Sequence, residues 1–162
     1  MRLEMIVSAL AHELRMRRWQ MASAESCTGG LIAGACTQAA GASEWFERGF
    51  VTYSNASKNE LLDVPLRLID EQGAVSEAVA RAMAAGALAH SCAQASVAVT
   101  GIAGPGGGSL AKPVGTVWFG WQVGNASFAQ RCYFSGGRLA VREATVAHAL
   151  QGLLERVRQQ EA

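Results

Sequence analysis

Ser26 is the residue whose type and position best suit covalent chemistry. It lies in the run AESCTGGL, residues 24–31, where an apolar segment ends and a helix-like pattern begins. A serine at such a junction faces the positive end of the helix, and neighbouring backbone N–H groups can hold an oxyanion. The run predicts a nucleophile, although a helix cap formed by Ser26 or Thr28 is the commoner role and stays open. The α/β-hydrolase elbow G-x-S-x-G is not matched, because Ala24 and Thr28 occupy its glycine positions.

A serine nucleophile needs a base, and Lys58 is the candidate. It falls in the first turn of a predicted helix, where the helix dipole disfavours a positive charge and lowers the pKa. A solvated surface lysine is the alternative. Tyr53, at the end of the preceding strand, could orient either partner or share in proton transfer. We expect Ser26 Oγ and the Lys58 amine to lie roughly 2.6 to 3.2 Å apart. Three histidines on predicted helices, away from the glycine-rich turns, are weaker candidates: His12, His90 and His148.

A second candidate stretch is TGIAGPGGG, residues 100–108, which follows a predicted strand. Residues 106–111 satisfy the letters G-x-G-x-x-A, but a dinucleotide fingerprint must open a helix, and Lys112-Pro113 leads into a strand instead. A P-loop is excluded by the absence of G-x-x-x-x-G-K-[ST]. The stretch is interpreted as a binding loop, with a flexible connection as the alternative.

Strands and helices alternate along the chain, and this order positions the candidate residues. A β-hairpin with Gly124-Asn125 at its turn precedes the last helix. The pattern predicts a single-domain α/β/α sandwich with a mixed sheet that includes this C-terminal hairpin. The predicted helices are residues 2–17, 28–40, 54–62 (starting at Ser54 or Ser57), 65–73, 76–92 and 137–158, and the strands are 19–24, 46–53, 95–100, 114–123 and 127–134.

Composition limits the classes of function. The 162 residues are 50% apolar and 17% charged, with a formal charge of +1 and one short basic cluster, Arg15 to Arg18. These features predict no nucleic-acid track, no membrane span and no signal peptide, and we expect a cytoplasmic location. Four separated cysteines without a CxxC pair favour reduced thiols, three of them buried, over a metal site. They are Cys27, Cys36, Cys92 and Cys132.

Five blocks of the sequence resemble one known family, the CinA C-terminal domain family, whose stand-alone members are nicotinamide mononucleotide deamidases. The blocks occur in family order from about Glu25 to Arg142, which is most of the chain. They are residues 24–31, Tyr53-Ser54-Asn55 with Lys58, residues 73–76, residues 99–105 and residues 112–117.

This resemblance implies hydrolysis of the carboxamide of nicotinamide mononucleotide to nicotinate mononucleotide and ammonia, in pyridine nucleotide salvage and without a metal or other cofactor. The family's serine maps to Ser26 as nucleophile, its lysine to Lys58 as base, and its tyrosine to Tyr53 as an aid to proton transfer. Backbone N–H groups of residues 28–30 would hold the oxyanion. The implied substrate-binding residues are Glu25, Thr28, Gly29, Gly30, Asn55, Thr100, Gly101, Ala103, Gly104, Arg138 and Arg142.

Two positions depart from the family pattern. Gly137 stands where an acidic residue or asparagine is common, and Ala56-Ser57 replaces the usual Glu-Ala. The larger family members also carry an N-terminal domain resembling molybdopterin-binding proteins. Because 162 residues leave no room for such a domain, residues 1–162 are expected to form one amidohydrolase domain.

Two other functions remain open. One is a non-catalytic nucleotide-binding regulatory module of the competence or damage-inducible type, and the other is an amidase for another small amide. The expected partner is a small nucleotide, without nucleic acid or membrane, and a homo-oligomer is expected with a dimer favoured. Trp118 and Trp121 on the hairpin could cover such an interface, but a core position is equally consistent with the pattern.

Overall fold

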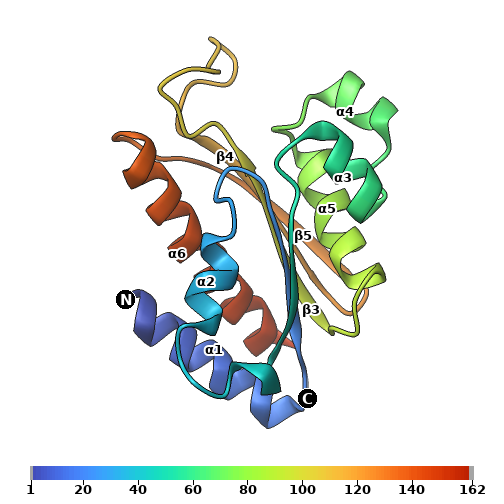
Figure 1. The fold of residues 1–162 in the computed structure, drawn as a ribbon, viewed down its shortest axis with the longest axis vertical. Coiled ribbons are helices and arrows are strands. Elements are labelled where there is room, and N and C mark those ends of the chain that lie inside the picture. The colour runs from blue at the N-terminus through green and yellow to red at the C-terminus, as the bar shows by residue number, and fades with distance from the viewer. Residues whose placement is uncertain (1, 161–162) are drawn as a thin grey trace.

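The computed structural model describes residues 2–160 as one five-stranded sheet between two layers of helices (Figure 1). The predicted α/β fold with a mixed sheet is confirmed. Along the chain the elements are α1 (Leu3–Arg17), β1 (Met21–Glu25), α2 (Leu31–Thr37), the 3₁₀ helix η1 (Ala42–Glu44), β2 (Phe46–Val51), α3 (Asn55–Leu62), α4 (Leu66–Gln72), α5 (Glu77–Ala89), β3 (Ala95–Gly101), β4 (Thr116–Val123), β5 (Ala126–Tyr133) and α6 (Arg138–Gln159).

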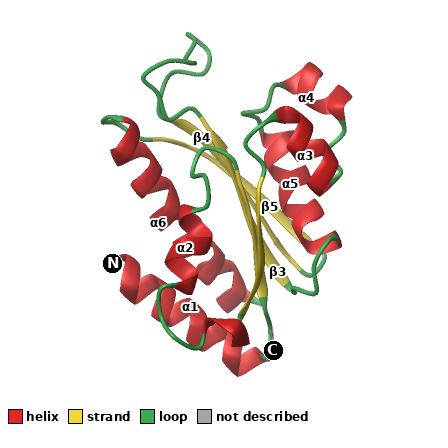
Figure 2. Cartoon of the chain, in the orientation of Figure 1, coloured by secondary structure: helices red, strands yellow, loops and turns green. Residues whose placement is uncertain are grey.

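The strand order is β2-β1-β3-β4-β5. β1 runs parallel to both β2 and β3, whereas β4 and β5 form the antiparallel hairpin expected around Gly124-Asn125. All five residues of β1 and the first six of β3 are buried, as expected for strands covered on both faces. Figure 2 shows these strands as the central layer, with loops gathered at both of its ends.

Two hydrophobic clusters hold the helical layers to the sheet. One joins α1, α2 and α6 to one face, and the other joins α3, α4 and α5 to the opposite face (Figure 1). Leu10 and Leu14 of α1 are fully buried, as their helical spacing predicted. Of the helices described, none is long and apolar enough to cross a membrane.

Trp121 belongs to the core and not to an interface. Its side chain is fully buried, its indole N–H donates to Ala149 O at 3.0 Å, and its ring stacks on Phe119. Gly152 permits this contact, because a Cβ there would lie 2.3 Å from the indole ring. Trp118 is half-buried.

Several predicted boundaries and burials need correction. The helix expected over residues 28–40 is shorter, because Gly29 and Gly30 adopt positive φ angles of 59° and 107° and delay its start to Leu31. The helix expected to reach residue 92 ends at Ala89. Only two cysteines are buried, not three, since Cys92 is exposed and Cys132 is half-buried; the buried pair is Cys27 and Cys36.

The carboxyl ends of β1, β2 and β3 meet at one edge of the sheet, because the three strands are parallel. β1 leads into Ser26, β2 into Thr52 and Tyr53, and β3 includes Thr100 and Gly101. In open α/β sheets, ligands bind in the crevice at this edge where the chain connections diverge. The fold therefore brings together three segments separated by up to about 75 residues.

Candidate active site

Ser26 and Lys58 form a buried pair at this edge. Ser26 Oγ and Lys58 Nζ lie 3.0 Å apart, which confirms the distance expected from the sequence. Ser26 is 8% exposed and Lys58 only 1%, so the interpretation of Lys58 as a solvated surface charge is wrong. Burial lowers the pKa of Lys58 to about 8. The neutral amine, which can accept a proton, is therefore much more populated near physiological pH than in an exposed lysine.

The start of α3 directs the Lys58 side chain inward. Ser54 caps this helix and shares a capping box with Ser57, which decides between the two starts that the sequence allowed. Besides Ser26, Lys58 Nζ contacts the carbonyl oxygens of Thr52 at 2.8 Å and Tyr53 at 3.3 Å. A neutral amine can donate its two N–H groups to these carbonyls and keep its lone pair for the serine proton.

The Ser26 turn, residues 26–30, is built around the carboxylate of Glu25. Glu25 is fully buried, and its side chain contacts its own chain. Its carboxylate accepts hydrogen bonds from Thr28 Oγ1 (2.5 Å) and from the backbone N–H groups of Gly30 (3.2 Å), Ile32 (2.9 Å) and Ala33 (3.1 Å).

Residues 28–30 form hydrogen bonds with Glu25 and Ser26. The N-cap of α2 is Gly30, without a side-chain cap, so the capping role considered for Ser26 or Thr28 is wrong. Thr28 is fully buried, and the Gly29 N–H donates to Ser26 O at 3.1 Å. Since the Gly30 N–H binds Glu25, two of the three expected oxyanion donors already have partners.

The two arginines of α6 differ in what they contact. Arg138 donates to Gly104 O at 2.8 Å and to the Tyr53 hydroxyl at 3.2 Å, and it lines the pocket beside Ser26. Arg142, one turn further along, donates to Cys27 O at 3.1 Å and Thr28 O at 3.2 Å. The predicted arginine pair is therefore split between the pocket and the Ser26 turn.

Tyr53 lines the pocket and is 62% exposed. Its carbonyl faces Lys58, while its hydroxyl accepts the hydrogen bond from Arg138. Asn55 also lines the pocket and is exposed at the first residue of α3. Both residues thus present polar groups at the mouth of the pocket.

The end of β3 and the residues after it contribute mainly backbone groups to the pocket. Thr100 lines the pocket, and its hydroxyl donates its hydrogen to Ala74 O at 2.8 Å, which leaves its oxygen as an acceptor. Gly101 and Ala103 line the pocket as expected, whereas the carbonyl of Gly104 accepts from Arg138. Beyond them, the glycine loop, residues 102–115, projects from the sheet between β3 and β4 (Figure 1).

The resulting pocket has a volume of about 230 Å³. Its lining residues are Ser26, Cys27, Tyr53, Asn55, Lys58, Ala74, Val75, Thr100, Gly101, Ala103 and Arg138. Within the described residues, Glu25, residues 28–30, Gly104 and Arg142 are outside this lining.

Sequence reasoning missed several residues here. Cys27 lines the pocket next to Ser26, but burial raises the pKa of its thiol to about 11, so the thiolate is scarce at neutral pH. Ala74 and Val75 lie in residues 73–76, one of the blocks that resemble the family, and this resemblance could have indicated that they line the pocket. The carbonyl of Thr52 accepts a hydrogen bond from Lys58 Nζ. This contact could not be predicted from residue type, because every residue has a backbone carbonyl.

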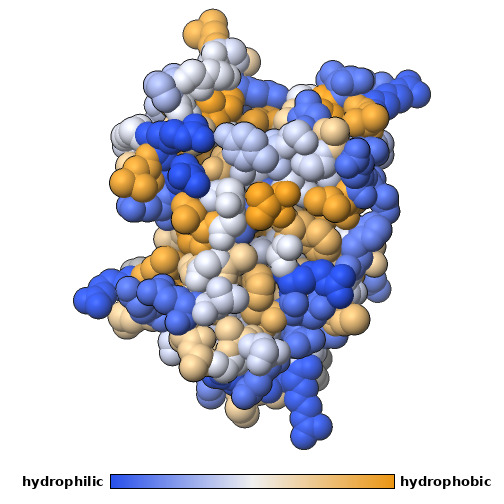
Figure 3. Space-filling view, in the orientation of Figure 1, coloured by the Kyte–Doolittle hydropathy of each residue, from blue (hydrophilic) through white to orange (hydrophobic). Residues whose placement is uncertain are grey.

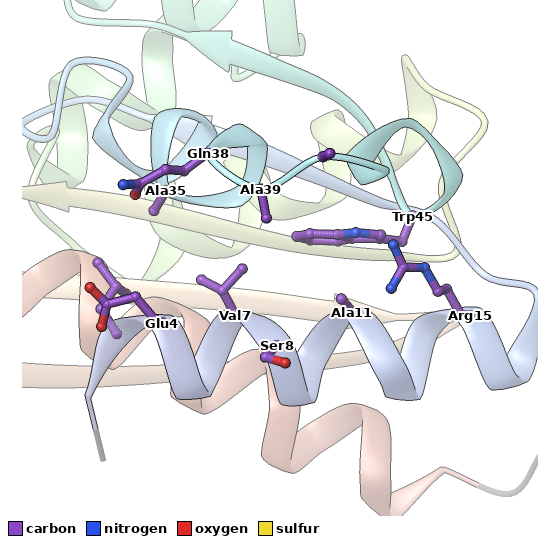
Figure 4. Close-up of a pocket in the computed structure, with 11 residues that line it drawn as sticks. Glu4, Val7, Ser8, Ala11, Arg15, Ala35, Gln38, Ala39 and Trp45 are labelled. Carbon is purple, nitrogen blue, oxygen red and sulfur yellow. The ribbon is translucent and has the colours of Figure 1, made fainter.

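A separate pocket of about 290 Å³ lies between α1 and the segment from Ala35 to Trp45 (Figure 4). Its walls are mainly alanines and other apolar side chains, and Arg15 at one end is engaged by Glu44 and Gly41 O. It has no nucleophile–base pair among its lining residues. Across residues 2–160, no three His, Cys, Asp or Glu side chains cluster as metal ligands would.

Comparison with known proteins identifies a matching family. The sequence model of the CinA C-terminal domain matches residues 3–157. A nicotinamide-nucleotide amidohydrolase PncC from Pseudomonas putida is 53% identical over 150 residues, which cover 93% of this chain and 94% of that protein. The nicotinamide-nucleotide amidohydrolase PncC of Escherichia coli K12 is 49% identical over 141 residues, or 86% of each chain.

A solved structure agrees with these sequence matches. The crystal structure of the competence damage-inducible protein A (ComA) from Klebsiella pneumoniae subsp. pneumoniae has a TM-score of 0.96 and 34% sequence identity to this chain. The match covers 99% of this chain and 100% of that one. The fold described above is therefore shared along the whole length of that protein.

Proposed function

Because this chain belongs to the CinA C-terminal domain family, we propose that it is a nicotinamide-nucleotide amidohydrolase. The proposed reaction converts nicotinamide mononucleotide and water to nicotinate mononucleotide and ammonia, as part of pyridine nucleotide salvage. Two relatives that match most of this chain carry the name nicotinamide-nucleotide amidohydrolase. The buried Ser26–Lys58 pair, 3.0 Å apart, is the observation that supports a catalytic role over nucleotide binding alone.

The first half of the proposed mechanism forms an acyl-enzyme. Neutral Lys58 takes the proton from Ser26 Oγ as this oxygen attacks the carboxamide carbon, and a tetrahedral oxyanion forms. When the oxyanion collapses, the C–N bond breaks and the Lys58 ammonium gives its proton to the departing nitrogen, which leaves as ammonia. The nicotinoyl group is then held as an ester on Ser26.

The second half releases the product. Lys58, again neutral, takes a proton from water while the water oxygen attacks the ester carbon. Collapse of this second intermediate breaks the bond to Ser26 Oγ, which recovers a proton from Lys58. The product leaves as nicotinate mononucleotide, and its carboxyl group ionises in solvent. Each step uses the same lysine as base and then acid, so its pKa of about 8 suits both directions of transfer.

Arg138 is the proposed partner of the substrate phosphate. It is the only cationic side chain besides Lys58 in the described pocket lining. A guanidinium can bind a phosphate through two parallel hydrogen bonds, and the exposed amide of Asn55 can add another donor. Tyr53 is proposed to orient Arg138 through its hydroxyl and to assist proton transfer at the mouth of the pocket.

The decisive experiment is ammonia release by the purified protein from nicotinamide mononucleotide, with the product identified by mass spectrometry. We expect turnover of the nucleotide and none of free nicotinamide, because the free base lacks the phosphate. Turnover of several unrelated amides would favour an amidase of another substrate. Tight nucleotide binding without ammonia release would favour the regulatory module and refute the proposed function.

A further inference from the structure

Two charged side chains, fully buried Glu25 and half-buried Arg142, form hydrogen bonds with the Ser26 turn. Glu25 accepts hydrogen bonds from the Thr28 hydroxyl and the Gly30 N–H in the turn, and from two further N–H groups in the first turn of α2. Arg142 binds two acceptors of the Ser26 turn, the carbonyl oxygens of Cys27 and Thr28, at 3.1 and 3.2 Å. Every one of these contacts involves backbone or side-chain atoms of the chain itself.

Glu25 also connects the turn to the base. Its backbone carbonyl accepts the Thr52 N–H at 2.7 Å and the Thr52 hydroxyl at 3.2 Å. The carbonyl of Thr52 in turn accepts from Lys58 Nζ at 2.8 Å. Glu25 is thus adjacent to Ser26 in sequence, and hydrogen bonds through Thr52 connect it to Lys58.

We propose that Glu25 and Arg142 are positioning residues for the Ser26–Lys58 pair and do not bind the substrate. This inference rests on the proposed amidohydrolase function. A catalytic pair must be held within about 0.5 Å of its productive geometry, which requires its supporting side chains to be fixed by packing and hydrogen bonds. Fully buried Glu25 meets that requirement, and Arg142 meets it by binding two consecutive carbonyls of the turn.

Arg138 and Arg142 provide a matched pair for the test, since they have the same chemistry and lie on the same helix four residues apart. For Arg142→Met we expect kcat to fall roughly tenfold to hundredfold while KM stays within about threefold. For Arg138→Met we expect the opposite split, with KM rising about tenfold or more. Calorimetric titration with nicotinate mononucleotide should show weakened product binding only in Arg138→Met.

Glu25→Gln tests the second proposed positioning residue. Glutamine keeps one acceptor oxygen, but its amide places N–H donors against the backbone donors that Glu25 now binds. We expect kcat to fall roughly tenfold to hundredfold with KM and product affinity within about threefold of wild type. The pH at which activity declines should stay near that of wild type, because burial and not Glu25 sets the lowered pKa of Lys58.

Covalent labelling of Ser26 by a small sulfonyl fluoride gives a readout that does not depend on the nucleotide. Both Glu25→Gln and Arg142→Met should slow this labelling, whereas Arg138→Met should not. Wild-type kcat in Glu25→Gln, or loss of product affinity in Arg142→Met to the extent seen in Arg138→Met, would overturn the proposal.

Folding is monitored by the melting temperature of each variant. If Glu25→Gln fails to fold, Thr28→Val replaces it, because it removes only the 2.5 Å hydroxyl bond to the carboxylate. Unchanged labelling and kcat in a folded Thr28→Val would then count against the role of Glu25. A wild-type protein that releases no ammonia refutes the proposed function, but the labelling rates still decide whether these two residues position Ser26.

Discussion

Two glycine-rich segments leave the same edge of the sheet and differ in the contacts that hold them. The Ser26 turn follows β1 and is held by hydrogen bonds to the carboxylate of Glu25 and the guanidinium of Arg142. The glycine loop follows β3 and projects away from the sheet, with an apolar tip at the top of the view in Figure 3. Leu110 in this loop is fully exposed.

The difference shows that glycine content alone does not identify an active site. Both segments contain glycines with positive φ, so both have the backbone freedom that a ligand-binding loop needs. In the Ser26 turn, fully buried Glu25 and half-buried Arg142 bind backbone groups. In the glycine loop, the side chains that bind backbone groups contact residues near its two ends, Arg138 at Gly104 O and Thr116 at Pro113 O, and Lys112 Nζ donates to Gln72 O. A site keeps a fixed geometry before substrate binds only where such supporting contacts hold its backbone and side chains.

Comparing one serine from each segment should give the largest effect. Ser26→Ala removes the proposed nucleophile, and we expect ammonia release to fall by about a thousandfold or more. Ser109→Ala, in the glycine loop, removes an acceptor for the Lys112 N–H and should leave activity within about twofold. Both rates are measured on nicotinamide mononucleotide at saturating concentration. Comparable losses in the two variants would contradict the assignment of chemistry to the Ser26 turn.

The chain has two lysines, Lys58 and Lys112, and they extend the comparison. Lys58→Met should lower kcat by about a thousandfold because the base is lost, whereas Lys112→Met should change it by less than about threefold. In wild type, the rate should rise with pH up to about 8 and then level off, since only the neutral amine accepts the serine proton. Below that pH it should fall about tenfold per unit. A flat pH–rate profile between 6 and 9 would exclude Lys58 as the base.

Much of the fold could be predicted because local patterns determined it. The spacing of Leu10 and Leu14 gave α1, Gly124-Asn125 gave the hairpin, and alternating strands and helices gave the layers. The Ser26–Lys58 distance was also predictable, since a serine nucleophile and its base must lie within hydrogen-bond reach of each other. The catalytic roles of these residues and the expected homo-oligomer stay predictions.

What the sequence could not supply are contacts that depend on tertiary structure. Glu25 reaches the N–H groups of α2 only because two glycines with positive φ bend the turn back toward it. Arg142 meets Cys27, 115 residues earlier in the chain, only through the packing of α6 beside α2. Residue type and spacing say nothing of such partners, so neither of these two contacts could be predicted from the sequence.

Single alanine substitutions at glycines separate backbone strain from lost contacts. Gly30 has a φ of 107° and the nearest atom to an added Cβ is 3.7 Å away, so Gly30→Ala introduces strain without a clash. We expect a loss of about 1 to 3 kcal/mol in the free energy of unfolding and a fall of roughly tenfold in kcat. Gly106→Ala, where an added Cβ meets no atom within 4 Å, should be neutral in both measurements. Equal effects would mean that the two segments are equally constrained.

The smallest effect is expected at Leu110 in the glycine loop. Leu110 is fully exposed, and it is absent from the pocket lining in the described part of the chain. Leu110→Ser should therefore leave the melting temperature unchanged and KM for nicotinamide mononucleotide within about threefold, because no buried apolar contact is lost. A KM increase of about tenfold, with an unchanged melting temperature, would show that the loop contacts the bound nucleotide. In that case the glycine loop would contribute to substrate binding, while the Ser26 turn would provide the geometry for catalysis.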